Sequence, residues 1–167
     1  QDVNPYQPLW DRVNDVKALY AETNEDYKST LQRRFFFFLF FQTLRCKDIT
    51  VYGVKFINSP FWTNNPNFSE NITIHGITIN NPDSPNTDGI NPESCKNVRI
   101  SDCYITVGDD CITIKSGRDA QGRRYNVPCE NISITNCTML AGHGGVVIGS
   151  EMSGSVRNIT ISNCVFD

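Results

Sequence analysis

Three aspartates and one histidine are the residues of this 167-residue sequence whose types and spacing are typical of acid–base chemistry. Asp109 and Asp110 are adjacent, Asp88 precedes them, and His143 lies in a Gly-His-Gly-Gly run. Carboxylates that share a small volume raise one another's pKa, so one stays protonated while another is ionised. Such a set supplies an acid and a base to one bond if the fold brings its members together.

Each member of this set also has an ordinary structural interpretation. Asp-Gly and Asp-Asp are common in turns, and Gly-His-Gly is compatible with a flexible loop. Clustered aspartates also bind calcium, but the sequence lacks an Asp-x-Asp-x-Asp series, and histidine is a poor calcium ligand. We therefore expect no metal ion and no cofactor, and we look for the element that would place the four side chains together.

That element is a repeat. Five segments share the order Asn or Asp, β-branched, polar, β-branched, and they start at Asp48, Asn71, Asn97, Asn131 and Asn158. The intervals lie mostly in the mid-twenties and the third is the longest, and no segment contains a convincing crossover helix or a tight Asn-Gly hairpin. This pattern favours an all-β parallel solenoid whose coils stack at about 4.8 Å. The repeated asparagines would then form a hydrogen-bonded ladder.

The repeat places the candidate residues in phase. Asp109 follows Asn97 by the same interval as His143 follows Asn131, the asparagine of its own repeat. Asp88 follows Asn71 by a longer interval, and a loop-out of about five positions in the intervening proline-rich stretch would bring it to the same phase. We predict that the four side chains gather on one face across three coils.

The same segments resemble the polygalacturonase family of glycoside hydrolases, family 28, and in particular its bacterial and plant exo-acting branch. The resemblance covers 46–167 and rests on Asn86-Thr87-Asp88-Gly89-Ile90, Gly108-Asp109-Asp110-Cys111-Ile112 and Gly142-His143-Gly144-Gly145, with support from Asn58–Thr63 and Ile114–Asp119. It implies a right-handed parallel β-helix that hydrolyses α-1,4-galacturonosyl bonds of pectin with inversion. By the same resemblance Asp109 is the general acid, Asp88 and Asp110 hold and activate water, and His143 tunes the acid or contacts the sugar.

A pectic substrate is a polyanion, so cations should line its cleft. Four of them follow the Asp pair where the repeat is longest: Lys115, Arg118, Arg123 and Arg124. We expect a loop there that overhangs the site and binds uronate carboxylates. Asn86 is assigned to substrate binding with them. The alternative is a solvated charged loop.

The chain divides into two parts. Residues 1–45 are expected to hold a short amphipathic helix, with Leu9, Val13, Val16 and Tyr20 on one face, and an apolar strand at Phe35–Phe41. Residues 46–167 are expected to hold the coils and to be incomplete at both ends, because the family's downstream Arg-x-Lys would fall beyond Asp167. We expect the chain to be the middle of a larger enzyme.

The composition argues against several classes of partner: nucleic acid, membrane and zinc. Fifteen Lys and Arg against 18 Asp and Glu give a net charge of -3, without a broad basic surface for nucleic acid. No apolar run approaches the roughly 20 residues that span a membrane. Seven cysteines without a CxxC pair predict buried thiols at equivalent positions, or a few disulfides, rather than zinc.

We therefore expect a monomeric hydrolase, secreted or periplasmic, that acts on polygalacturonate. Two alternatives stay open. One is a non-catalytic β-helix, an adhesin or carbohydrate-binding solenoid. The other is a pectate lyase, which would need calcium.

Overall fold

The structure is a computed structural model that describes residues 39–167. The helix expected around residues 9–20 and most of the apolar strand expected at Phe35–Phe41 lie outside the described residues. The described part is built almost wholly from short strands. It contains no helix long and apolar enough to cross a membrane.

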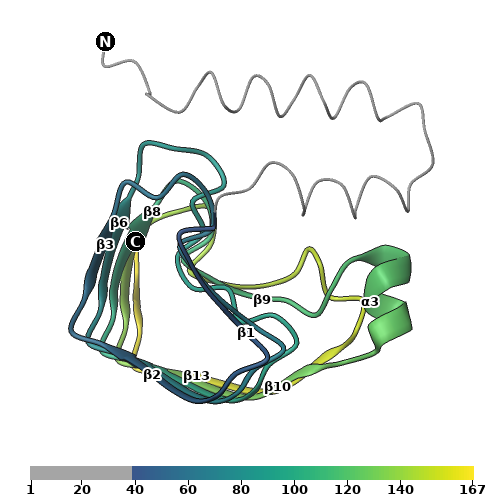
Figure 1. Ribbon diagram of the computed structural model, residues 1–167. Coiled ribbons are helices and arrows are strands. Elements are labelled where there is room, and N and C mark those ends of the chain that lie inside the picture. Colours follow the sequence, from purple (N-terminus) through teal and green to yellow (C-terminus); the bar gives the residue numbers. More distant parts are fainter. Residues whose placement is uncertain (1–38) are drawn as a thin grey trace, which may run out of the picture.

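The strands form three parallel faces that wind along one axis (Figure 1). Sheet A holds β1 (Phe41–Leu44), β4 (Asn64–Asn67), β9 (Ile112–Ile114) and β12 (Val146–Ile148). Sheet B holds β2 (Lys47–Tyr52), β5 (Glu70–His75), β7 (Lys96–Ser101), β10 (Cys129–Thr135) and β13 (Val156–Ser162). Sheet C holds β3 (Lys55–Ile57), β6 (Thr78–Asn81), β8 (Tyr104–Val107), β11 (Thr138–Ala141) and β14 (Val165–Phe166).

Each coil contributes one segment to each face. The two strand pairs of sheet A, β1 with β4 and β9 with β12, are joined by isolated parallel bridges through Ile90 and Glu93. All pairings are parallel, and consecutive partners come from consecutive coils. The predicted parallel β-solenoid is confirmed.

Aliphatic side chains fill the inside of the solenoid in columns. In sheet B, Ile72, Val98 and Ile132 stand in register on adjacent strands and are 0%, 1% and 2% exposed. Alternation places every second residue inside, which suits β-branched side chains. Full burial of one such side chain contributes roughly 1.5–3 kcal/mol before conformational entropy is counted. This repeated burial holds the coils together.

The predicted asparagine ladder is present where the coils enter sheet B. The five repeat residues all have left-handed backbones, with φ between 55° and 58°. Each side-chain amide donates to the residue one coil earlier. The Nδ2–Oδ1 distances are 2.9 Å from Asn71 to Asp48, 3.1 Å from Asn97 to Asn71, 3.0 Å from Asn131 to Asn97 and 3.0 Å from Asn158 to Asn131. Asparagine suits the position because it tolerates this backbone and also bonds locally.

The cysteines stand at equivalent positions of successive coils. Cys95 lies opposite Cys129, and the backbone N–H of Cys95 contacts the Cys129 sulfur at 3.4 Å. Cys103, Cys137 and Cys164 precede residues that pair in sheet C. All seven are free, and five are buried. The exceptions are Cys46, which is exposed, and Cys164, which is partly exposed; they lie in the first and last described coils.

The extra length of the longest repeat forms α3 (Asp119–Tyr125), the one helix among residues 39–167, where the sequence predicts a loop. The helix begins after Arg118 and ends at Asn126, which has a left-handed backbone and donates its N–H to the carbonyl of Gly122. Tyr125 packs edge-on against Phe68 with 5.5 Å between ring centroids. This contact holds α3 at the corner between sheets A and B.

The ladder predicts an order of stabilities at Asn97. Asn97→Gly keeps the left-handed backbone and loses the ladder bonds, whereas Asn97→Ala loses both. We expect the free energy of unfolding of Asn97→Gly to be about 0.5–1.5 kcal/mol lower than that of the unsubstituted chain. That of Asn97→Ala should be lower by a further ~1 kcal/mol. Denaturant titration measures both. Arg99→Ala, on the same exposed face, serves as the control; equal stability of Asn97→Ala and Arg99→Ala would show that the ladder contributes nothing.

The thiol columns predict a stepwise titration. Burial raises the pKa of Cys95 and Cys111 to about 12, so these thiolates are scarce at neutral pH. In the native protein we expect fast reaction with a disulfide reagent at Cys46 and partial reaction at Cys164. The five buried thiols should react only after denaturation. Seven fast thiols in the native protein would contradict the stacked arrangement.

Candidate active site

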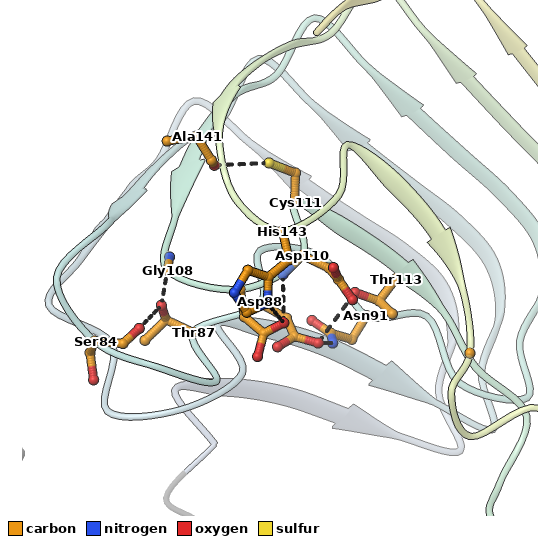
Figure 2. Close-up of polar contacts among 12 residues, drawn as sticks. Ser84, Thr87, Asp88, Asn91, Gly108, Asp110, Cys111, Thr113, Ala141 and His143 are labelled. Atoms are coloured by element: carbon orange, nitrogen blue, oxygen red, sulfur yellow. Dashed lines mark hydrogen bonds and ion pairs between the residues drawn. The ribbon is translucent and has the colours of Figure 1, made fainter. Parts of the chain in front are cut away.

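The acidic residues lie where the coils enter sheet A, and the close-up in Figure 2 shows Asp88, Asp110 and His143 side by side. Asp109 and Asp110 lie just before β9. The backbone N–H of Gly89 donates to the carbonyl of Asp110 at 3.0 Å, and the parallel register then places Asp88 opposite Asp110 on the neighbouring coil. The structure therefore brings the four residues singled out by the repeat into one cluster.

A loop on the preceding coil sets this register. The interval from Asn71 to Asp88 exceeds that from Asn97 to Asp110 by four positions, where the sequence predicts a loop-out of about five. The stretch 82–86 leaves the coil after β6 and returns at Thr87. The added positions are thus absorbed before the pairing with the next coil begins.

Thr87 and Gly108 hold that loop against the next coil (Figure 2). The Thr87 hydroxyl lies 2.8 Å from the carbonyl oxygen of Asn81 and 2.6 Å from that of Ser84, and it accepts the Gly108 N–H at 3.1 Å. A Cβ on Gly108 would stand 2.2 Å from the Ser84 carbonyl oxygen, so no other residue fits without movement. The approach of the loop therefore depends on a glycine directly before the Asp pair.

Asp88 is a buried acid, with 3% of its surface exposed. Its Oδ2 accepts hydrogen bonds from Asn91 Nδ2 at 2.7 Å and from Thr113 Oγ1 at 3.2 Å. Burial, reinforced by the negative charges of Asp109 and Asp110, raises the pKa of Asp88 to about 6. The carboxyl can thus change its protonation state near neutral pH.

Asp110 and Asp109 are more open. Burial, followed by the charge of Asp109, raises the pKa of Asp110, while Lys115 and His143 act in the opposite direction. Asp109 has a side chain that is 25% exposed, and its Oδ1 lies 3.4 Å from Nδ1 of His143. The His143 side chain is 78% exposed, so it stands on the open side of the cluster. A partly exposed acid beside a buried one suits contact with a substrate from outside.

Lys115 lies in the protein interior and not on the exposed loop that the sequence predicts. Its side chain is 5% exposed, and Nζ lies 3.7 Å from Asp88 Oδ2 and 2.8 Å from Glu151 Oε2. It also donates to the carbonyl of Gly149 at 3.3 Å and stands 4.6 Å from the centre of the Trp62 ring. The ammonium is held by the protein and faces Asp88.

The other expected substrate contacts lie elsewhere. Arg118, Arg123 and Arg124 are exposed and belong to α3 or to the residue before it. They follow the carboxyl end of β9, whereas the acids precede its first residue. Asn86 is partly exposed in the loop before Thr87 and has a left-handed backbone. The cluster of acids thus does not include the three arginines.

Sequence reasoning missed three residues of the cluster: Asn91, Thr113 and Glu151. The first two were accessible, because the repeat register places Asn91 opposite Thr113, one residue beyond the paired Ile90 and Ile112. Glu151 had no signal in the sequence, since it follows β12 in an irregular stretch of the coil that also carries His143. Within the described range, no group of three or more His, Cys, Asp or Glu residues is arranged to hold a metal ion.

The arrangement has the parts of an acid–base site. Two aspartates face each other on adjacent coils, about 4.8 Å apart along the axis, and a third stands beside them at the surface. Burial favours the protonated form of Asp88, and the charge of Lys115 favours its ionised form. Carboxyl groups whose environments differ in this way are those that divide acid and base roles.

Comparisons with known proteins place these motifs in a family. The sequence model described as "Glycosyl hydrolases family 28" matches residues 31–167. The chain is similar to a "Probable polygalacturonase" of Vitis vinifera, with 46% identity over 120 residues, which cover 71% of this chain and 24% of the relative. It is also similar to an "Endo-polygalacturonase" of Pectobacterium carotovorum subsp. carotovorum, with 36% identity over 125 residues, which cover 74% of this chain and 29% of the relative.

A solved structure shares the coils. The crystal structure of a hyperthermoactive exopolygalacturonase from Thermotoga maritima is 50% identical, with a TM-score of 0.73, over 74% of this chain and 28% of that one. The chain spans about a quarter of the length of these relatives. Since the family model covers most of the sequence, and the acids that carry its motifs stand together on the coils, the chain belongs to the glycosyl hydrolases of family 28.

Proposed function

We propose that these coils form the catalytic centre of a polygalacturonase, which cleaves α-1,4-galacturonosyl bonds of pectic polysaccharide with inversion. The observation that carries this proposal is the pair of facing aspartates, Asp88 buried with a raised pKa and Asp110 opposite it, beside the more exposed Asp109. The names of the relatives, endo- and exopolygalacturonases, support the choice of substrate.

The proposed reaction needs one proton donor and one proton acceptor. Asp109 donates a proton to the glycosidic oxygen as the bond from the anomeric carbon to that oxygen breaks. Asp88 and Asp110 take a proton from a water molecule that attacks the anomeric carbon from the opposite side. Inverting hydrolysis needs roughly 6.5–9.5 Å between acid and base, and residues on neighbouring coils are separated by one or two steps of about 4.8 Å.

His143 and Lys115 act through the aspartates in this proposal. His143 lies against Asp109 on the open side, where it can hold the orientation of the acid or contact the sugar. Lys115 keeps Asp88 able to ionise, because its positive charge opposes the effect of burial. Lys115 is therefore a positioning residue and does not contact the substrate carboxylates.

Pectin is a polymer of plant cell walls, so an enzyme that degrades it meets its substrate outside the cytoplasm. We propose a secreted or periplasmic protein that acts as a monomer. The clustering of three aspartates and His143 favours a hydrolase over a non-catalytic carbohydrate-binding solenoid, which has no need of these residues in one place. A pectate lyase would release unsaturated product and require calcium.

The role of the acid predicts the effect of Asp109→Asn in the full-length protein. The amide cannot donate a proton to the leaving oxygen, so kcat should fall by about 10²–10⁴-fold with little change in KM. Reducing ends released from polygalacturonate measure the rate. Asp119→Asn, which removes an exposed carboxylate on α3, should retain activity. Unchanged turnover in Asp109→Asn would remove this residue from the mechanism.

The environment of Asp88 predicts a pH profile. As a base Asp88 must be ionised, so the acid limb of the kcat/KM profile should rise with pH through about 6, the value to which its pKa is raised. This rising part of the pH profile reports the macroscopic titration of the coupled aspartates together. The same shift weakens folding as pH rises from the ordinary value of 3.8 to about 6, because the folded chain binds this proton more tightly than the unfolded chain.

Lys115→Met tests the source of that limb. Without the charge that lowers the pKa of Asp88, the acid limb should move to higher pH. Lys55→Met, an exposed lysine at the start of β3, is the matched control and should leave the profile unchanged. A limb that stays in place, or moves to lower pH, in Lys115→Met would contradict the assignment.

A further inference from the structure

A groove lies at the corner where the coils pass from sheet A to sheet B. It has a volume of about 340 Å³, and four successive coils contribute to its walls. Lys47 and Lys96, which line it, begin β2 and β7 of sheet B, whereas Asp109 and Asp110 precede the sheet A strand β9. The groove is therefore separate from the acidic cluster, and it runs along the solenoid axis.

The floor of the groove carries a column of charges in register. Lys47 pairs with Glu70, Glu70 with Lys96, Lys96 with Glu130 and Glu130 with Arg157 across sheet B. The ion-pair distances are 2.5 Å for Lys47–Glu70, 3.4 Å for Lys96–Glu130 and 2.6 Å for Arg157–Glu130. These cations are mostly exposed, and such surface pairs contribute little to stability. They can therefore exchange partners with a ligand.

The groove has a surplus of positive charge in a chain whose net charge is -3. Arg45, Lys47 and Lys96 line the groove and exceed its two glutamates, Glu70 and Glu130, by one charge. Arg157 continues the column beyond the residues that line the groove. Arg45 has no ion pair among the described residues. Helix α3, whose Tyr125 packs on Phe68 in the wall of the groove, carries Arg123 and Arg124 in its last turn. The corner attracts anions.

The shape selects among anions. Successive coils are about 4.8 Å apart, so Lys47 and Lys96, two coils apart, stand on the order of 10 Å from each other along the groove. Glu70 stands between these two lysines, so a polymer that carries carboxylates along its length can bind both lysines by taking the place of the glutamate. Phe68, which is partly exposed in the wall, offers an aromatic surface for the apolar face of a sugar ring.

We propose that this groove is a second binding site for a polyuronate chain, remote from the acidic cluster. The choice of a uronate polymer rests on the proposed function, whereas the charge and the shape of the groove do not. A chain held here would raise the concentration of its other segments near the acids, as any tethered ligand does. The groove would then affect KM for long chains and leave kcat unchanged.

Lysine acylation followed by mass spectrometry locates the ligand. The full-length protein is treated with an acylating reagent with and without oligogalacturonate, in an Asp109→Asn background that prevents turnover. We expect the acylation rates of Lys47 and Lys96 to fall several-fold with ligand, while exposed Lys55, which lies outside the groove, is acylated as before. Oligogalacturonate whose carboxylates are fully methyl-esterified should give no protection.

Substitution tests the energetics. Arg45→Ser combined with Lys96→Ser should weaken oligogalacturonate binding at the groove by roughly threefold or more, since two charge contacts are lost. Lys55→Ser combined with Arg99→Ser removes the same charge from exposed positions elsewhere and should have a smaller effect. Thermal unfolding confirms that both variants are folded. In the active enzyme the groove variant should raise KM for long chains without changing kcat.

Three outcomes would overturn the proposal: equal protection of Lys55, protection by the methyl ester, or equal loss of affinity in the two double variants. If Lys47 and Lys96 are protected in an otherwise unsubstituted protein that releases no reducing ends, the second binding site is supported and the proposed function is refuted. If the protein hydrolyses polygalacturonate but these lysines are not protected, the proposed function is supported and the second binding site is refuted.

Discussion

Coil-to-coil register is the constraint on which everything else in this molecule depends. Parallel pairing fixes which residue of one coil lies against which residue of the next, and the asparagine ladder repeats that choice once per turn. A slip of one residue would turn the isoleucine columns outward and the polar side chains inward. The cluster of acids exists because Asp88 and Asp110 occupy equivalent places in this register.

Insertions are confined to the corners, where they leave the register intact. The four added positions before Thr87 bulge from one corner and are held by a single hydroxyl and by the absence of a Cβ at Gly108. The longer insertion between sheets A and B folds into α3 and rests on Phe68. The first insertion stands beside the acids and the second beside the basic groove. The corners thus differ in function although the sheets between them are alike.

The architecture and the cluster of acids were accessible from the sequence because both follow from one period. The ladder positions, the inward β-branched residues and the phase of Asp109 with His143 could all be counted along the chain. The environment of Lys115 could not, because its ammonium reaches back to Asp88 and across to Glu151 on another coil, and neither contact follows the period. The helical form of residues 119–125 was also missed, since insertions have no register to read. The roles of the four site residues come from family resemblance and stay predictions.

The stacked thiols also provide a route by which unfolding of this protein becomes irreversible. Five cysteines are shielded in the native solenoid, and burial holds the pKa of those at positions 95 and 111 near 12, so exchange with external disulfides is slow while the coils are closed. Cooperative unfolding would release all five at once into whatever oxidant surrounds the chain. Disulfide formation takes seconds to hours, so mispaired disulfides would trap the chains that stay open for that long. In an oxidising medium the survival of the protein therefore depends on how often and for how long the solenoid opens, because trapping by a mispaired disulfide removes the open chain from the equilibrium.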